Sequence, residues 1–124
     1  MDVTLWVVAG LLAAAFLSAG ALKLSQPRQA LATSGQGWVE DFSAGQVKVI
    51  GTLEVLAAIG LILPAVLGLA PIVVPLTATG LVLLMVGAML THARRDERSH
   101  MGVNVVLATM AVFVAWGRFG PYPL

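Results

Sequence analysis

The sequence contains no cysteine, and this absence excludes several kinds of chemistry together. Without thiols there is no disulfide, no iron–sulfur cluster, no thiolate metal site and no CxxC redox pair. Histidine is scarce as well, with only His92 and His100, so no pair of axial haem ligands lies within the apolar runs. No glycine-rich phosphate-binding motif stands between a strand and a helix. We therefore expect no metal site and no resident haem or flavin.

Charged residues are almost as scarce. They make up 10% of the 124 residues, and 7 Lys and Arg stand against 6 Asp and Glu. No basic face is available to neutralise phosphates, which excludes nucleic acid as a partner. Hydrophobic residues reach 59%, whereas soluble domains average about 45–50% apolar and about 25% charged residues. A soluble fold of this length has no room to bury so much apolar surface, so a lipid bilayer is the natural solvent.

Four apolar runs are long enough to cross a bilayer core about 30 Å thick. They cover residues 3–24, 47–63, 72–90 and 101–119, with boundaries that are approximate. The first run follows an acidic start, Met1-Asp2, and is too long for the apolar part of a signal peptide, so we interpret it as a retained membrane helix. We predict an all-α fold in which residues 1–124 form a single membrane domain, a bundle of four transmembrane helices.

The connection from residue 24 to residue 46 is too long for a simple turn. It mixes apolar residues such as Leu31, Trp38 and Phe42 with charged ones, and Pro27 is suited to open a short helix. This composition predicts a segment that lies along the membrane surface between the first two membrane helices. Two roles stay open for it, a lid over a site or an inert re-entry segment.

Basic residues are distributed unequally between the two sides of the predicted bundle. The side of the connections 24–46 and 91–100 carries six of them, Lys23, Arg28, Lys48, Arg94, Arg95 and Arg98. The opposite side carries only Arg118. By the positive-inside rule, both connections are expected to be cytoplasmic and both termini outside the cell membrane. We expect the charged run 91–100 to be a loop with His100 solvated, and Lys48 to extend toward the lipid headgroups.

Glu54 is the most unusual residue, because it lies inside the apolar stretch VIGTLEVLAAIGLILP at 49–64. It is seven residues past Val47, about 10 Å along a helix, where a charge costs about 3 kcal/mol on insertion scales. Gly51, Ala57 and Ala58 share its helix face, and such small residues allow neighbouring helices to pack closely. We therefore expect Glu54 to face the bundle interior and to pair with Lys23 or His92 of another helix.

Other polar residues fall in the same half of the predicted bundle and complete a candidate site. The candidate ligand-binding residues are Lys23, Trp38, Glu54, His92 and Asn104. Glu54 and His92 are the candidate catalytic residues, since both side chains can carry a proton. Structural roles stay open: a Glu54–Lys23 pair that fixes the order of the helices, Asn104 as a link between two helices, and Trp38 as an interfacial anchor.

Four stretches of the sequence resemble the DoxX-like family of small four-helix membrane proteins. They are FLSAGALKL at 16–24, VIGTLEVLAAIGLILP at 49–64, AMLTHARRDE at 88–97 and VNVVLATMAVFVAWGRF at 103–119. The resemblance covers nearly the whole chain and implies the four-helix architecture. The family takes its name from membrane subunits associated with thiosulfate-to-quinone electron transfer, so the resemblance also implies a redox-associated role.

Four functions remain open at this point. The leading one is an intramembrane pocket that binds a quinone or another lipophilic small molecule, with electrons supplied by a partner redox protein at the Arg94, Arg95 and Arg98 loop. The alternatives are a cofactor-independent enzyme of the isomerase or cyclase type that uses Glu54, a small proton-coupled transporter, and an assembly subunit. A homo-oligomer is also left open.

Overall fold

The computed structural model describes all 124 residues and contains helices but no strands. The elements are α1 (Asp2–Ser25), α2 (Arg28–Thr33), the short 3₁₀ helix η1 (Gly37–Asp41), α3 (Ala44–Leu67), α4 (Val73–Arg94) and α5 (Arg98–Phe119). Helices α1, α3, α4 and α5 are each long and apolar enough to cross a membrane. The prediction of an all-α bundle with four membrane helices is therefore confirmed.

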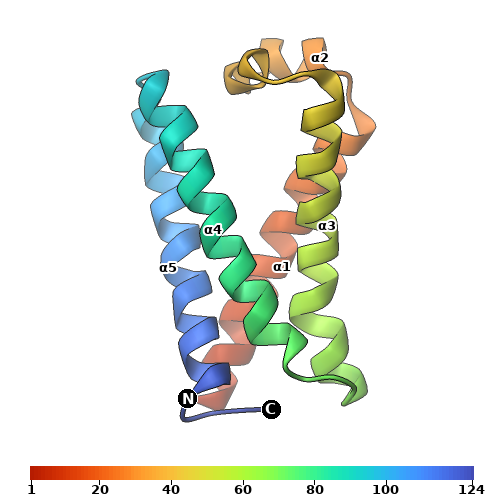
Figure 1. The fold of residues 1–124 in the computed structure, drawn as a ribbon, viewed down its shortest axis with the longest axis vertical. Helices are drawn as coiled ribbons and strands as arrows, with labels where there is room; N and C mark the ends of the chain where they lie inside the picture. Colours follow the sequence, from red (N-terminus) through yellow and green to blue (C-terminus); the bar gives the residue numbers. More distant parts are fainter.

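The four long helices form two pairs. The most extensive contacts join α1 to α3 and α4 to α5, and smaller contacts join the pairs to each other. The pairs diverge toward the end that carries α2, while both termini lie at the other end (Figure 1). An apolar core holds the pairs together, formed mainly by Leu12, Phe16, Leu61, Leu81 and Val114.

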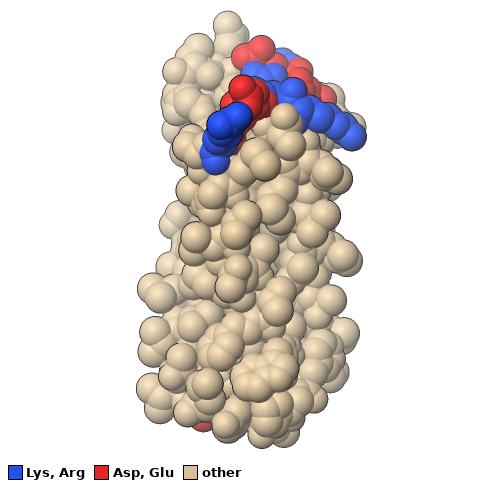
Figure 2. Space-filling model, turned by 90° about the vertical axis from the view of Figure 1, so that its left-hand side faces the viewer, with Lys and Arg blue, Asp and Glu red and all other residues tan.

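The outer surface of the bundle is apolar. Large side chains such as Leu11, Leu53, Leu83 and Val103 are half or more exposed on it. Lys, Arg, Asp and Glu gather at one end of the molecule, and the long flank between the two ends lacks them (Figure 2). A surface of this kind suits hydrocarbon rather than water, because exposing a large apolar area to water is unfavourable. The fold is that of a multi-pass membrane protein.

Helix α3 is longer than the predicted run 47–63. It begins at a capping box, in which Ser43 Oγ accepts from the Gln46 N–H at 3.1 Å and the Gln46 side chain accepts from the Ser43 N–H at 2.8 Å. It continues past Pro64 and ends at Gly68, whose φ of +67° suits a glycine helix end. Pro64 removes a single helical hydrogen bond near the end, and the helix continues for one more turn after it.

The prediction that residues 91–100 form a loop is wrong. Helix α4 runs on to Arg94 and α5 begins at Arg98, so the turn itself contains only Arg95, Asp96 and Glu97. Asp96 takes the left-handed conformation at φ +55°, which aspartate tolerates better than most residues. The basic residues His92 and Arg94 fit the last turn of α4, because positive charge is favourable at a helix C-terminus.

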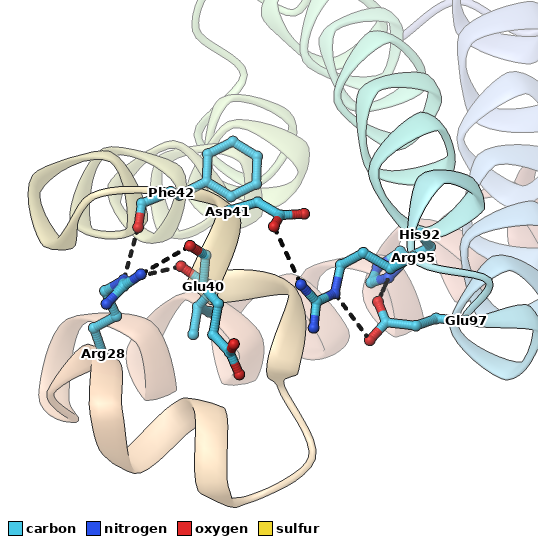
Figure 3. A network of polar contacts seen from close by, with 8 residues as sticks. Arg28, Glu40, Asp41, Phe42, His92, Arg95 and Glu97 are labelled. Carbon is cyan, nitrogen blue, oxygen red and sulfur yellow. Dashed lines mark hydrogen bonds and ion pairs between the residues drawn. The ribbon is translucent and has the colours of Figure 1, made fainter.

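The connection between α1 and α3 packs at the charged end of the bundle. It has a small core of its own, formed by Leu31, Trp38, Val39 and Val47. Arg28 fixes its path: Nε donates to the carbonyls of Val39 (3.0 Å) and Phe42 (2.7 Å), and Nη2 donates to that of Glu40 (2.9 Å) (Figure 3). The segment is thus well packed and hydrogen-bonded rather than a loosely held loop.

Lys48 has a different role from the one predicted. Its Nζ donates to the carbonyls of Lys23, Leu24 and Gln26 at 2.8–3.0 Å, instead of extending to the headgroups. The last carbonyls of a helix have no partner within the helix, and a basic side chain can satisfy them. Lys48 therefore caps α1 and joins its end to the start of α3.

Candidate functional site

A close crossing of α1 and α3 sets the position of the first two site residues. A Cβ added at Gly20 would lie 2.6 Å from the carbonyl oxygen of Gly51, so the two backbones approach as closely as glycine allows. Lys23 and Glu54 each follow one of these glycines by three residues, and they meet across the crossing. Lys23 Nζ lies 2.7 Å from Glu54 Oε1, with the side chains 9% and 6% exposed. The contact is a buried ion pair.

A cavity of about 580 Å³ lies beside this pair, with walls from all four long helices and from the η1 region. All five predicted ligand-binding residues line it: Lys23, Trp38, Glu54, His92 and Asn104. Most of the remaining wall is apolar, with Phe16, Met85 and Leu107 among its residues. Pockets for small molecules typically measure about 300–1,000 Å³ and combine apolar walls with a few polar groups.

Burial of polar groups is concentrated at this cavity. Only five polar or charged side chains are buried in the protein, namely Lys23, Glu54, His92, Asn104 and Arg118. The first four line the cavity. Arg118 lies at the other end of the bundle, where its Nη1 pairs with Asp2 at 2.6 Å and donates to the carbonyl of Tyr122. Four of the five polar side chains that are costly to bury thus line the same cavity.

Asn104 differs from the other buried polar residues because its amide nitrogen has no partner. Nδ2 is buried and makes no hydrogen bond in the protein. A buried donor without an acceptor costs about 1–3 kcal/mol. The predicted alternative, a hydrogen bond between two helices, is absent for this atom. Asn104 lines the cavity, and its Nδ2 is left as a buried donor without a partner.

Trp38 lines the cavity at its charged end. Its Nε1 donates to Gln36 Oε1 at 2.8 Å, and its ring meets the rings of Phe42 and His92 edge to face, with centroids 5.7 and 6.3 Å apart. Lys23 Nζ lies 5.4 Å from the centroid of the same ring, within cation–π range. Trp38 is buried within the protein, so it is part of the roof of the site.

His92 contacts two residues that were not among the predicted site residues. Its Nδ1 lies 2.8 Å from Glu97 Oε1, and its ring stacks on that of His100 with centroids 4.7 Å apart. The hydrogen bond from His92 lowers the pKa of Glu97 below its ordinary 4.5, and Arg95 adds to the effect. Because Glu97 is then a carboxylate, Nδ1 carries the proton, and Nε2 makes no hydrogen bond within the protein.

His100 is half-buried in the cavity wall, so the prediction that it is solvated is wrong. This prediction failed because residues 91–100 were expected to form a loop. A three-residue turn instead brings the start of α5 against the end of α4. The spacing of five residues between His92 and Glu97 is the only signal in the sequence for their contact. It becomes meaningful only once the turn is known to be tight.

Arg95 links the roof of the cavity to the turn between α4 and α5. Its Nη1 lies 3.1 Å from Asp41 Oδ1, next to η1, and its Nε lies 3.4 Å from Glu97 Oε2 (Figure 3). Of the three arginines predicted to dock a partner, Arg95 is therefore engaged within the protein. Arg98 makes only a 3.5 Å contact with Asp96 between highly exposed side chains, and such surface pairs contribute little.

These features define an integral membrane protein of the four-helix bundle class. It contains a cavity whose polar lining residues gather at the charged end of the bundle. The sequence pattern of the DoxX-like family matches residues 7–114, and the chain belongs to this family. No curated protein matches the chain significantly, and neither does any solved structure. No group of three or more His, Asp or Glu side chains is placed to hold a metal ion.

Proposed function

We propose that the protein binds a quinone, or a lipophilic molecule with a similar polar head, in this cavity. The observation that carries the proposal is that Asn104, whose buried Nδ2 has no partner, lines a mostly apolar cavity together with Lys23. A quinone has a flat apolar ring and carbonyl oxygens that accept hydrogen bonds. Asn104 Nδ2 and Lys23 Nζ are donors of the kind that such oxygens require.

The protonatable residues suit a ligand that is reduced. Reduction of a quinone to a quinol takes two electrons and two protons, and we assign to His92 and Glu54 the relay of protons, which they accept from water at the charged end and pass to the ligand. Glu97 fixes the imidazole of His92 through Nδ1, which leaves Nε2 free to exchange protons with the ligand. The electrons come, in this proposal, from a partner redox protein at the charged end, where Arg94 and Arg98 are exposed.

Binding can be followed by the fluorescence of Trp38, because quinones quench tryptophan and the other two tryptophans lie outside the cavity lining. In Trp6→Phe/Trp116→Phe protein in lipid nanodiscs, Trp38 is the only tryptophan. Addition of menaquinone or ubiquinone is expected to quench it in a saturable way, with an endpoint near one quinone per protein.

The matched control is Trp38→Phe, which retains Trp6 and Trp116. Its fluorescence is expected to fall only in proportion to the quinone dissolved in the lipid, without saturation. Equal quenching curves for the two proteins would exclude a quinone in the cavity.

We also propose that the charged end faces the cytoplasm and that both termini lie outside the cell membrane. Six of the seven Lys and Arg residues lie at the charged end, and the α1–α3 and α4–α5 connections meet there. A C-terminal alkaline phosphatase fusion is expected to be active, and a C-terminal green fluorescent protein fusion dark. The reverse pattern would invert the proposed orientation, and fusions made after Asp96 serve as the control of opposite sign.

A further inference from the structure

The cavity reaches the lipid-facing surface of the bundle along one face of α4. Leu83, Gly87 and Leu90 all line it, and their spacing of four and three residues places them on a single stripe of the helix. All three are exposed on the outside of the protein, Leu83 at 70% and Leu90 at 55%. A residue that is exposed to lipid and also lines the cavity marks a place where the cavity is open sideways.

The polarity of the cavity changes in one direction along its length. On α4 it extends nine residues from His92 to Leu83, about 14 Å, and on α1 it extends eight residues from Lys23 to Ala15, about 12 Å. On both helices the polar residue lies at the charged end and the apolar residue lies deeper in the bundle. This gradient fits a ligand with one polar head and one apolar tail, in a single orientation.

Part of the charged end of the cavity is covered by protein. The buried ring of Trp38 lies over Lys23 and against His92. The segment that carries Trp38 is held by Arg28 on one side and by the Arg95–Asp41 ion pair on the other (Figure 3). The stripe of α4 that lines the cavity ends at the exposed Arg94, so its apolar part, from Leu83 to Leu90, is the part of the opening that suits lipid.

We infer that the ligand enters the cavity sideways from the bilayer and that its apolar tail leaves the cavity along the stripe of Leu83, Gly87 and Leu90. This inference rests on the proposed function and adds a requirement to it: the ligand is a long-tailed amphipath, such as a quinone with an isoprenoid chain. Its head lies among Lys23 and Asn104, and its tail lies beside α4.

Gly87 offers a direct test, because a Cβ added there meets nothing within 4 Å and a larger side chain fits without disturbing the helix packing. Gly87→Phe places a ring in the proposed exit. Gly80→Phe is the matched control, since Gly80 lies two turns earlier on the same face of α4, is equally exposed and open, and does not line the cavity. Both changes are made in the protein with Trp38 as its only tryptophan.

The binding of long-tailed menaquinone and of tail-free menadione is then compared at equal mole fractions in nanodisc lipid. Gly87→Phe is expected to weaken menaquinone binding by about tenfold or more, the effect of overfilling a packed contact. Menadione binding is expected to stay unchanged, and Gly80→Phe is expected to alter neither. Equal effects of Gly87→Phe on both quinones, or no effect on either, would overturn the tail exit. Absence of binding by both quinones to the unmodified cavity would overturn the proposed function itself.

Discussion

Replacement of Lys23 by Met is expected to lower the free energy of unfolding by about 3–5 kcal/mol. Methionine keeps the apolar stem of lysine but leaves the carboxylate of Glu54 without its charge partner, 2.7 Å away in the native protein. Both side chains are almost completely buried, so water cannot replace the ammonium group. Unfolding by sodium dodecyl sulfate or heat, in matched detergent micelles, measures the loss.

The double variant Lys23→Met/Glu54→Leu is the control, because it removes both charges. It is expected to recover most of the lost stability, since replacing a buried ion pair by apolar residues is often neutral or stabilising. If the pair belongs to the site, this variant folds but binds quinone weakly. If the pair only fixes the order of the helices, the variant binds as well as the native protein. Native stability of Lys23→Met alone would contradict the ion pair.

Replacement of Asn104 by Leu is expected to have two effects of opposite sign. Quinone affinity falls about tenfold to a hundredfold, because a hydrogen bond from Nδ2 to the ligand is lost. Stability without ligand rises by about 1 kcal/mol, because the buried Nδ2 has no acceptor in the protein and the amide is exchanged for an apolar group. Titration of the Trp38 reporter measures the first effect, and thermal unfolding in the absence of quinone measures the second.

Thr109→Val is the matched control on the same helix. Its hydroxyl donates to the carbonyl of Val105 at 2.8 Å, and the residue is exposed and does not line the cavity. It is expected to leave quinone affinity unchanged. A loss of more than about 1 kcal/mol of stability in Asn104→Leu would instead support the alternative hypothesis, that Asn104 links two helices.

The candidate site was predictable in part because its most costly members stand out against an apolar background. Glu54, Lys23, His92 and Asn104 interrupt or flank runs that otherwise belong in lipid, and helical geometry turns the Gly51–Ala58 face of α3 inward. Glu97 and His100 could not be found in the same way. They lie in a charged stretch where polar residues are expected, and only the three-residue turn between α4 and α5 brings them against His92.

The sequence was sufficient to predict that this protein lies in a lipid bilayer, how many membrane helices it has and at which end its polar groups gather. These properties depend on the length and the composition of each run, which are local. Only the folded arrangement of the helices shows that Glu54 pairs with Lys23 rather than His92, that Nδ2 of Asn104 has no partner, and that Gly87 lines the cavity. The reason is physical: these outcomes depend on where helices cross, and the crossing of α1 and α3 is set by backbone contact at Gly20 and Gly51.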